Sequence, residues 1–255
     1  MYEKTLLVSI IIPTFNRAHT LKRAINSVLY QTYRPLELII IDDCSMDSTI
    51  QLLKNFDFKD VDFQILNNEK NLGIGRSRNL GIKSANGDYL AFLDSDDEWN
   101  NPDKIKLQVD FLINNPDYWF VSTAWDREGI RFERNKSYFS DDDSFRNIAL
   151  FYCPALTSTW LFKKSLTLKA GYFWPARTED YEYLLRIWKF TKCYSINSVC
   201  LLGHPTVNGD YNSNKLFSGL IAIYICILYW NIYPHFFKAI FLRCCRGIRI
   251  LNIFH

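Results

Sequence analysis

The N-terminal part of this chain alternates short apolar runs with stretches of helical periodicity, and this alternation constrains the fold more than any other feature. The apolar runs Leu6–Ile12, Leu36–Ile41, Phe63–Leu66 and Tyr89–Leu93 have the length and the apolar content of buried strands. Between the first two, Thr20–Gln31 repeats apolar residues at helical spacing. Continuous apolar strands that alternate with helices are typical of a parallel sheet with helices on both faces. The sequence therefore predicts an α/β fold, with a mostly parallel central sheet flanked by helices.

The same patterns predict several element boundaries. Pro13 is expected to end the first strand, and Ser48 is expected to cap a short helix. A further helix is predicted over Ile74–Ser84, and a further strand over Tyr118–Ala124.

Polar and acidic residues directly follow three of these predicted strands. The first strand ends at PTFNR, the second at DDCS and the fourth at DSDDE. In parallel sheets of this kind, ligands bind at the carboxyl ends of the strands. The sequence therefore predicts a binding site where the three segments meet.

The segment after the fourth strand contains Asp94, Asp96, Asp97 and Glu98. Carboxylates so close together repel one another unless a cation lies among them. Oxygen ligands suit Mg²⁺ or Mn²⁺, which keep several waters and are usually shared with substrate phosphates. The segment thus predicts a divalent cation, with a diphosphate as its second partner. The alternative is a solvated turn that leads into a helix starting near Pro102.

Asp42 and Asp43 stand where the second strand leaves the sheet. A carboxylate at this position can accept hydrogen bonds from a nucleobase N–H or from ribose hydroxyls. The alternative is a simple turn in which an aspartate caps the following helix.

The segment NLGIGRSRNLGI contains part of a dinucleotide-binding pattern, with Gly73 and Gly75 in its first two glycine positions. Arg78 occupies the third glycine position, which disfavours a redox Rossmann domain. The same segment offers Arg76 and Arg78, whose guanidinium groups suit phosphate oxygens. The alternative is that both arginines lie on a solvated helix face.

Glu179 and Asp180 follow Thr178 at the predicted start of a helix. Acids in a first helical turn complement the helix dipole, so a purely structural role is one interpretation. The other is a general base, which must be ionised and within hydrogen-bond reach of a substrate hydroxyl.

Charge and cysteine content narrow the function classes. A net charge of +3 does not indicate a nucleic-acid partner, and no acid follows Asp210. The seven cysteines have no C-x-x-C spacing, so they favour reduced thiols over a disulfide framework. The start of the chain, MYEKTLLVSIIIP, runs straight into a strand and does not have the pattern of a secretory signal.

Three segments taken in order resemble the family 2 glycosyltransferases. They are VSIIIPTFNRAHTLKRAINSVLYQTYRPLELIIIDDCSMDST, then NLGIGRSRNLGIKSANGDYLAFLDSDD, then GYF followed by EDYEYLLRI, and the resemblance covers residues 5–190. It implies the A-type glycosyltransferase fold, a nucleotide-diphosphate sugar donor (a UDP-sugar), Mn²⁺ or Mg²⁺, and inversion at the anomeric carbon. It also implies a glycan or glycolipid acceptor, in the synthesis of cell-surface polysaccharide or lipopolysaccharide.

The match to the family is residue by residue, with one departure and one loose match. The departure is Trp174-Pro175, where relatives usually have Asp-Glu, and it bears on the acceptor side. His204 lies where some relatives place a further metal contact, although LLGHPTV is a loose match. The implied donor-binding residues are Pro13, Thr14, Asn16, Arg17, Asp43, Arg78 and Asp94, the implied metal ligands are Asp96 and Asp97, and the implied catalytic base is Asp180.

Two other function classes stay open. A nucleotidyltransferase could use the same sheet and metal, but it normally has a glycine-rich loop after the first strand, and PTFNRAHT has none. A binding protein without catalytic activity would not need both Asp96 and Asp180. Release of a nucleotide diphosphate, rather than pyrophosphate, distinguishes a glycosyltransferase from the first alternative.

The predicted domain organisation separates a catalytic domain from a C-terminal segment. Residues 1–210 form the catalytic domain, with a nucleotide-binding half (1–100) and an acceptor half (101–210), and residues 211–255 form an apolar and basic segment. Residues 216–237 contain no Asp, Glu, Lys or Arg, and a segment of that length could span a bilayer.

The basic tail argues against spanning. A cytosolic donor implies a cytoplasmic catalytic domain, and a single span would then carry Arg243, Arg246 and Arg249 to the outer side, against the positive-inside tendency. We therefore expect this segment to lie on the cytoplasmic face of the membrane without crossing it, with its basic tail on anionic headgroups. The alternative is a helix packed on the catalytic domain.

Overall fold

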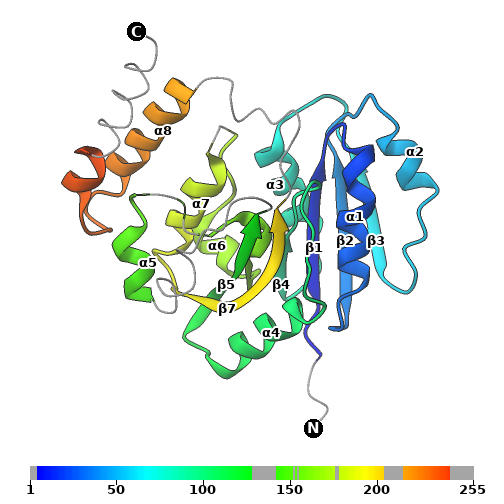
Figure 1. The fold of residues 1–255 in the computed structure, drawn as a ribbon, viewed down its shortest axis with the longest axis horizontal. Coiled ribbons are helices and arrows are strands. Elements are labelled where there is room, and N and C mark those ends of the chain that lie inside the picture. The colour runs from blue at the N-terminus through cyan, green and yellow to red at the C-terminus, as the bar shows by residue number, and fades with distance from the viewer. Residues whose placement is uncertain are drawn as a thin grey trace.

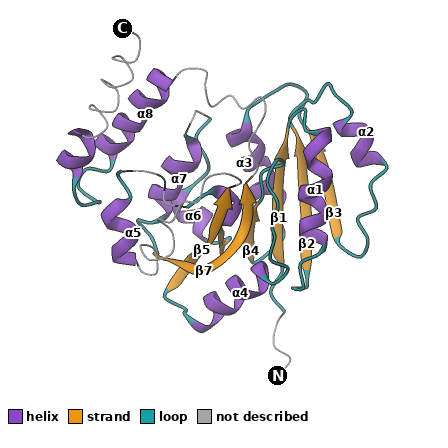
Figure 2. Cartoon of the chain, viewed as in Figure 1, coloured by secondary structure: helices purple, strands orange, loops and turns teal. Residues whose placement is uncertain are grey.

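The computed structural model describes residues 5–127, 142–151, 153, 155–175, 178–203 and 215–241. Its centre is a seven-stranded sheet in the order β3-β2-β1-β4-β6-β5-β7, with helices on both faces (Figure 1, Figure 2). The strands are β1 (Val8–Thr14), β2 (Leu36–Asp42), β3 (Asp62–Asn67), β4 (Tyr89–Phe92), β5 (Tyr118–Arg127), β6 (Leu161–Lys163) and β7 (Lys192–Gly203). The helices are α1 (Ala18–Leu29), α2 (Thr49–Lys54), α3 (Ile74–Ser84), α4 (Lys104–Asn114), α5 (Asp142–Ile148), α6 (Leu166–Ala170), α7 (Glu179–Ile187) and α8 (Lys215–Leu228), with a 3₁₀ turn η2 (Thr157–Thr159).

Strands β3, β2, β1 and β4 are parallel, as the apolar runs predict. Alternate residues of β1 point to opposite faces of the sheet, so Ile10 and Ile12 pack in a core with α1 and α4, whereas Ile11 packs in a second core with α3 and α7. Each strand of this half except β3 is buried along its whole length. Burial on both faces explains why these strands are continuous apolar runs.

The order in which the chain adds strands to the sheet reverses at β1. The chain passes from β1 outward to β2 and β3, and then returns to place β4 on the other side of β1. Such a topological switch point opens a crevice outside the carboxyl ends of the adjacent strands, where ligands bind in open α/β sheets. The crevice therefore lies beyond Thr14 and Phe92.

The prediction that Pro13 ends the first strand is wrong, because β1 continues to Thr14. Pairing of β1 with β4 stops at Ile11 opposite Phe92, and from Ile12 onward β1 pairs only with β2. A proline is tolerated where one side of a strand has no partner. Pro13 thus marks the point where β1 leaves β4 and the crevice begins.

The second half of the sheet is mixed. β6 is antiparallel to both β4 and β5, while β5 and β7 are parallel to each other. The sequence predicts the start of β5 at Tyr118 and the helix Ile74–Ser84, and the structure confirms both. It also predicts a cap by Ser48, which stands at the N-cap of α2 but makes no side-chain cap hydrogen bond.

Helix α8 packs on the catalytic domain through one face, at the end of the molecule farthest from β3 (Figure 1). The Tyr229 hydroxyl donates to Glu182 Oε1 over 2.6 Å, and the Tyr233 hydroxyl donates to the Leu185 carbonyl over 2.6 Å. Among the described residues, no helix is both long and apolar enough to cross a membrane. His204, Arg243, Arg246 and Arg249 lie outside the described residues.

Candidate functional site

A cavity of about 400 Å³ lies at the carboxyl ends of β1, β2 and β4, at the switch point of the sheet. It brings together six of the predicted site residues, which are separated by up to 83 positions in the sequence. Its lining residues are Pro13, Thr14, Phe15, Arg17, Asp43, Asn71, Gly73, Ile74, Ser77, Asp94, Ser95 and Asp96.

Asp43 joins the end of β2 to the loop before α3. Its Oδ1 accepts hydrogen bonds from the Leu72 N–H (2.8 Å) and the Asn68 side chain (2.7 Å), and its Oδ2 accepts from the Gly73 N–H (2.8 Å). Gly73 has φ +86°, a conformation that favours glycine. Asp43 is therefore a fixed acceptor in the cavity wall, and it supports the loop before α3 rather than capping α2.

Thr14 carries an unexplained polar atom. Thr14 is one of the cavity-lining residues, and its buried Oγ1 has no hydrogen-bond partner within the described part of the chain. A buried hydroxyl without a partner is uncommon, and it suggests a ligand group that is absent. The orphaned oxygen thus supports a polar ligand at this site.

Asn16 has a structural role in the same region. Its side-chain oxygen accepts from the Met46 N–H (2.8 Å) and the Asp47 N–H (3.3 Å), and its own N–H donates to Ser45 Oγ (2.8 Å). It has φ 52°, in the left-handed region that asparagine tolerates. Asn16 holds the loop after β2 and does not line the cavity.

Two arginines hold the acidic segment, one at the N-cap of α1 and one in the middle of that helix. Arg17 Nη2 lies 3.6 Å from Asp96 Oδ2, and Arg23 Nη2 donates to the Asp96 carbonyl over 2.8 Å. Arg23 also pairs with Glu98 over 3.2 Å. On the other side, Glu98 forms an isolated antiparallel bridge with Leu202 of β7. The acidic segment is thus an anchored loop rather than a solvated turn.

Asp97 points to a different partner. Its Oδ2 accepts from the Ser158 hydroxyl over 2.7 Å, and Ser158 Oγ also accepts from the Asp94 N–H over 3.0 Å. Asp97 does not line the cavity, whereas Asp94 and Asp96 do.

The carboxylates fit a metal that is shared with a substrate. Among the described residues, no group of three or more His, Cys, Asp or Glu side chains could hold a metal ion by itself. Asp96 lines the cavity that contains Thr14, and Asp97 is the next residue of the same turn, so both supply hard oxygen donors in this region. Mg²⁺ and Mn²⁺ are commonly bound by one or two carboxylates and completed by phosphate oxygens and water. The residues present therefore fit an ion completed by a diphosphate, and do not form a closed protein site.

Arg78 is buried between two carboxylates. Its side chain is 2% exposed, Nη2 donates to Asp94 Oδ1 over 2.7 Å, and Nη1 donates to Glu179 Oε1 over 2.7 Å. Arg76, in contrast, is exposed, so the solvated-face interpretation holds for Arg76 only. Arg78 thus links Asp94, which follows β4, to Glu179 at the start of α7, and Arg78 and Glu179 are 101 positions apart in the sequence.

Burial changes the acidity of this cluster. Burial raises the pKa of Glu179 to about 7, Arg78 opposes that shift, and the neighbouring Asp180 adds to it. Burial also raises the pKa of Asp180, again opposed by Arg78. The carboxylates beside Arg78 raise its own pKa, so the guanidinium stays charged. One buried cation therefore serves Asp94, Glu179 and Asp180 together.

Asp180 stands in the first turn of α7, after Thr178 in a left-handed conformation with φ 61°. Its Oδ1 accepts from the Tyr181 N–H over 2.7 Å. Asp180 is not among the cavity-lining residues, but its charge interacts with those of Arg78 and Asp94. The structure thus brings Asp180 to the same charged cluster as Asp94, which lines the cavity.

Helix α3 also fixes the loop that carries the sequence departure. Asn79 exchanges two hydrogen bonds of 2.8 Å with the Phe173 backbone. A Cβ on Gly75 would lie 2.5 Å from the Trp174 carbonyl oxygen, so only glycine permits this close approach. The Trp174 loop is therefore held directly against α3, near the start of α7.

Comparison with known proteins identifies the family. The family model described as "Glycosyl transferase family 2" matches residues 9–177, which include β1 to β4 and the whole cavity. The chain belongs to glycosyl transferase family 2. Asp180 lies just beyond the matched residues, and the acidic segment lies well within them.

A relative from Escherichia coli is WfgD, a "UDP-Glc:alpha-D-GlcNAc-diphosphoundecaprenol beta-1,3-glucosyltransferase". It is 42% identical over 109 residues, which are 43% of this chain and 42% of WfgD. The chain therefore matches less than half the length of this relative.

Solved structures of other glycosyltransferases share the fold. TarS residues 1–349 of S. aureus, in complex with UDP-GlcNAc, aligns with a TM-score of 0.74 at 18% identity, over 91% of this chain and 69% of that one. The mannosyltransferase PcManGT of Pyrobaculum calidifontis, in complex with GDP-Man and Mn²⁺, aligns with a TM-score of 0.71 at 18% identity, over 92% and 68%. These likenesses show the A-type glycosyltransferase fold.

Several residues of this family 2 site carry no local sequence signal. Ser158 and Arg23 contact the acidic segment from 61 and 73 positions away, respectively. In the sequence, Glu179 stands beside Asp180 at the predicted start of a helix, and nothing there indicates that it pairs with Arg78. Only the positions of η2 and α1 relative to β4 reveal these partners.

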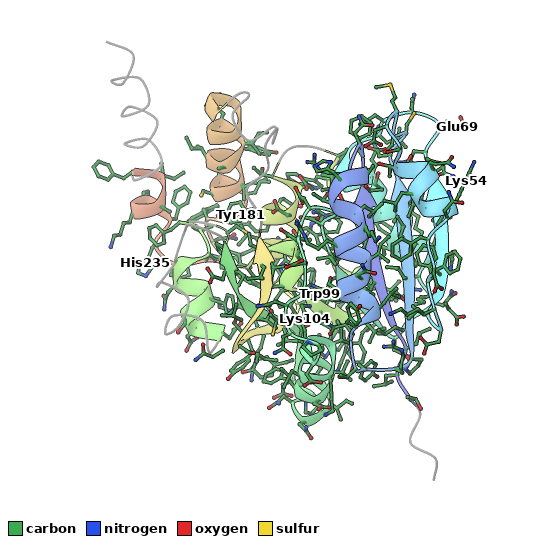
Figure 3. The ribbon with its side chains drawn as sticks, turned by 45° about the vertical axis from the view of Figure 1, so that its right-hand side comes forward. Lys54, Glu69, Trp99, Lys104, Tyr181 and His235 are labelled. Carbon is green, nitrogen blue, oxygen red and sulfur yellow. The ribbon has the colours of Figure 1, made fainter. Side chains whose placement is uncertain are left out.

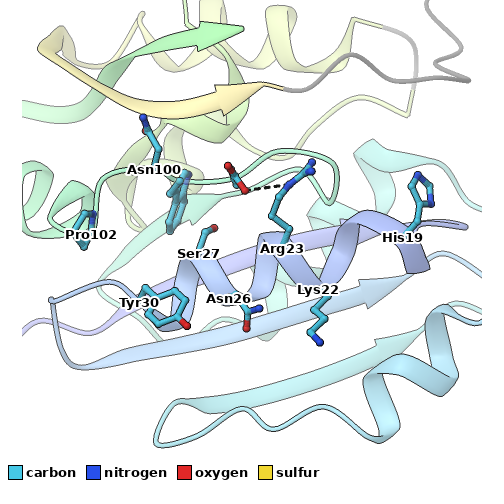
Figure 4. Close-up of a pocket in the computed structure, with 10 residues that line it drawn as sticks. His19, Lys22, Arg23, Asn26, Ser27, Tyr30, Asn100 and Pro102 are labelled. Atoms are coloured by element: carbon cyan, nitrogen blue, oxygen red, sulfur yellow. Dashed lines mark ion pairs between the residues drawn. The ribbon is translucent and has the colours of Figure 1, made fainter. Parts of the chain in front are cut away.

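A second, larger cavity of about 790 Å³ lies between α1 and the segment before α4 of this family 2 chain (Figure 4). His19, Lys22 and Tyr30 line it from α1, and Asn100 lines it from the opposite side (Figure 4). It contains none of the residues predicted to bind the donor, the metal or the acceptor proton. The larger of these two cavities is therefore not the one that contains the predicted site residues.

Proposed function

We propose that this family 2 glycosyltransferase transfers a sugar from a UDP-sugar to an acceptor hydroxyl with inversion, in the synthesis of cell-surface polysaccharide, lipopolysaccharide or glycolipid. The observation that carries the proposal is the cavity at the switch point, which joins Asp43, Asp94 and Asp96 to an orphaned Thr14 hydroxyl. The name of WfgD supports a UDP-sugar and a lipid-linked acceptor, and the TarS complex supports a uridine nucleotide.

The donor-side roles follow from the cavity wall. Asp43 accepts hydrogen bonds from the nucleobase, and Asp94 accepts from the ribose. Pro13 and Thr14 form the floor at the end of β1, and the Thr14 hydroxyl gains a partner when the nucleotide is bound. Asn16 keeps the neighbouring loop in place.

The diphosphate side depends on charge. Arg17 faces the cavity beside Asp96, where it can also contact phosphate oxygens. Asp96 and Asp97 would hold Mn²⁺ or Mg²⁺, and the bound ion would offset the negative charge that builds on the departing nucleotide diphosphate. Arg78 is already bound by Asp94 and Glu179, so it serves this region by orienting Asp94 rather than by direct contact.

Asp180 removes the acceptor proton as the acceptor oxygen attacks the anomeric carbon. A raised pKa brings this carboxylate closer to the working pH than an ordinary aspartate, which improves a general base. Attack by the acceptor from the face opposite the leaving diphosphate gives inversion in one step. The half-buried Trp174, held against α3 near α7, contributes to the acceptor side.

The decisive experiment is a donor screen with MnCl₂ or MgCl₂ and a lipid-linked or free glycan acceptor, read by released nucleotide diphosphate and by the product's anomeric configuration. We expect UDP release that requires acceptor, and an inverted linkage. Release of pyrophosphate would instead identify a nucleotidyltransferase, and no turnover with any donor would favour a binding protein. A retained anomeric configuration would contradict the single displacement.

We also propose that the C-terminal segment 211–255 lies on the cytoplasmic face of a membrane, where a lipid-linked acceptor would be presented. The face of α8 and the following turn that points away from the catalytic domain is apolar, and no acid follows Asp210. Exposed apolar patches of this kind mark interaction surfaces, and basic residues favour anionic lipid. The exposed residues are Leu220, Tyr224, Ile227, Leu228, Trp230, Phe237 and Phe241.

Flotation with vesicles of zwitterionic lipid, with and without anionic lipid, tests this membrane contact. We expect the protein to float with anionic vesicles, and the triple variant Trp230→Ser, Phe237→Ser and Phe241→Ser to remain at the bottom. The control is Leu168→Ser, which removes an apolar side chain that is 88% exposed on α6. Equal flotation of the triple variant, or none by the wild type in low salt, would contradict membrane contact through this face.

A further inference from the structure

We infer that Ser158 is a positioning residue that orients the Asp97 carboxylate for metal binding. This inference rests on the proposed metal-dependent glycosyl transfer, and it assigns a role to the 3₁₀ turn η2, which lies 61 positions from Asp97 in the sequence. The residue is fully buried, and it contacts the acidic segment at two points.

Both hydrogen-bonding functions of the Ser158 hydroxyl are directed at the acidic segment. The hydroxyl donates its hydrogen to Asp97 Oδ2 over 2.7 Å and accepts from the Asp94 N–H over 3.0 Å. The Asp97 N–H also donates to the Asp94 carbonyl over 3.0 Å, which closes a tight turn. One hydroxyl thus ties the two ends of the acidic turn to the same point.

The backbone of η2 is itself held from the side of α4. Trp99 Nε1 donates to the Ser158 carbonyl over 2.8 Å, and Gln108 Nε2 donates to the Thr159 carbonyl over 2.8 Å. Lys104 Nζ donates to Gln108 Oε1 over 2.7 Å and lies 4.1 Å from the centre of the Trp99 ring. Figure 3 shows Trp99 and Lys104 close together.

This arrangement has a consequence for the metal site. All of these side chains are buried, so the turn has little freedom to move, and it can impose its geometry on Asp97. A carboxylate that is held by a hydrogen bond to one oxygen keeps its orientation before the ion arrives. Residues that orient metal ligands typically change metal affinity by about 10–100-fold when they are replaced. Ser158 should therefore affect the binding of Mn²⁺ more than the binding of nucleotide.

The experiment measures free Mn²⁺ by electron paramagnetic resonance during titration of the full chain with MnCl₂ at saturating UDP. We expect Ser158→Ala to weaken the apparent Mn²⁺ affinity by about 10-fold or more. UDP binding without metal should stay unchanged. The matched control is Thr159→Val, which removes a hydroxyl from the same buried turn. That hydroxyl donates to the Leu156 carbonyl over 2.6 Å and has no bond to the acidic segment in the described contacts, so we expect its Mn²⁺ affinity to stay within about twofold of wild type.

A cycle with Asp97→Asn separates positioning from general damage to the turn. If Ser158 acts through Asp97, Ser158→Ala has no further effect on Mn²⁺ affinity in the Asp97→Asn background. Wild-type Mn²⁺ affinity in Ser158→Ala, or an equal loss in Thr159→Val, overturns the inference while the proposed function stands. Absence of UDP-dependent Mn²⁺ binding in the wild type overturns the proposed metal site itself. Should Ser158→Ala not fold, Ser158→Cys keeps the volume with a weaker hydrogen-bond donor, and wild-type affinity there also overturns the inference.

Discussion

The two halves of this glycosyltransferase differ in how their strands pair and in which elements carry the predicted site residues. In the half that carries the proposed donor cavity, β1, β2 and β4 are parallel, and their carboxyl ends supply Thr14, Asp43 and Asp94 to one crevice. In the other half, β6 runs antiparallel between β4 and β5, and Asp180 is carried by a helix start rather than by a strand end.

The difference shows how each half is held in place. Thr14, Asp43 and Asp94 stand at or within two positions of the end of a buried strand, so backbone pairing places them. Asp180 lies at the start of α7, and this end of the helix is tied to the cavity wall by a side-chain bridge from Asp94 through Arg78 to the neighbouring Glu179. We therefore expect changes on the donor side to alter binding, and changes around α7 to alter chemistry or stability.

The largest expected effect is a fall in kcat when Asp180 is replaced. Asp180→Asn should lower kcat by roughly 10²–10⁴-fold, because it removes the proposed general base, while UDP binding stays nearly unchanged. Steady-state kinetics and equilibrium UDP binding measure the two effects. Asp143→Asn is the control, since Asp143 is an exposed acid in the first turn of α5 and should affect neither. Loss of donor binding or of the fold in Asp180→Asn would favour the purely structural role.

Among these variants, loss of the Asp94–Arg78–Glu179 bridge should lower the free energy of unfolding most. Arg78→Met leaves Glu179 and Asp94 without their buried cation, and loss of one partner of a buried ion pair destabilises by about 3–5 kcal/mol. Chemical denaturation measures the free energy of unfolding. Arg76→Met, on the exposed face of the same helix, should change it by less than about 0.5 kcal/mol. Equal effects of the two variants would mean that the bridge contributes little.

On the donor side, Asp96→Asn should reduce the apparent affinity for Mn²⁺ in turnover by at least the roughly 10–100-fold seen when metal-site residues are replaced. The fold should survive, because the Asp96 carboxylate is partly exposed and lies in an anchored loop. The measurement is the UDP release rate against MnCl₂ concentration, with Asp60→Asn, an acid that is 77% exposed on its side chain, as control. A near-wild-type rate at low metal concentration would contradict the metal assignment.

The smallest expected effect is a shift in pH dependence. A general base must be deprotonated, so kcat/KM falls as the pH drops below its pKa. Burial raises the pKa of Asp180, and this acid limb should therefore lie above the ordinary aspartate value of about 3.9. Asp94→Asn removes a nearby negative charge that raises the pKa of Asp180 and frees Arg78 to stabilise the Asp180 anion, which moves the limb to lower pH. A limb that stays in place or moves upward in this variant would contradict the electrostatic coupling.

Much of the donor half can be predicted from the sequence, because its signals are local. A buried parallel strand needs a continuous apolar run, and the polar residues after that run must lie at the sheet's carboxyl edge. Of the residues predicted to form the site, Pro13, Thr14, Arg17, Asp43, Asp94 and Asp96 line the cavity, whereas Asn16 supports a loop and Asp97 faces Ser158. Which side chain lines a cavity depends on its rotamer and its partners, and spacing in the sequence does not specify them.

The sequence alone determined the parallel sheet, the family and the position of the acidic segment, because each follows from periodicity or from the order of short motifs. Only the tertiary structure decided that Arg78 is a buried bridge rather than a surface cation, and that Ser158 contacts Asp97. The same holds for residues 216–237, which contain no Asp, Glu, Lys or Arg in the sequence. In the structure this segment buries Ile225, Cys226 and Tyr229, with Tyr229 bonded to Glu182 of α7, and its exposed side chains include Leu220, Tyr224 and Ile227. The physical reason is that burial and pairing are properties of contacts between distant segments, whereas periodicity records only what each segment requires by itself.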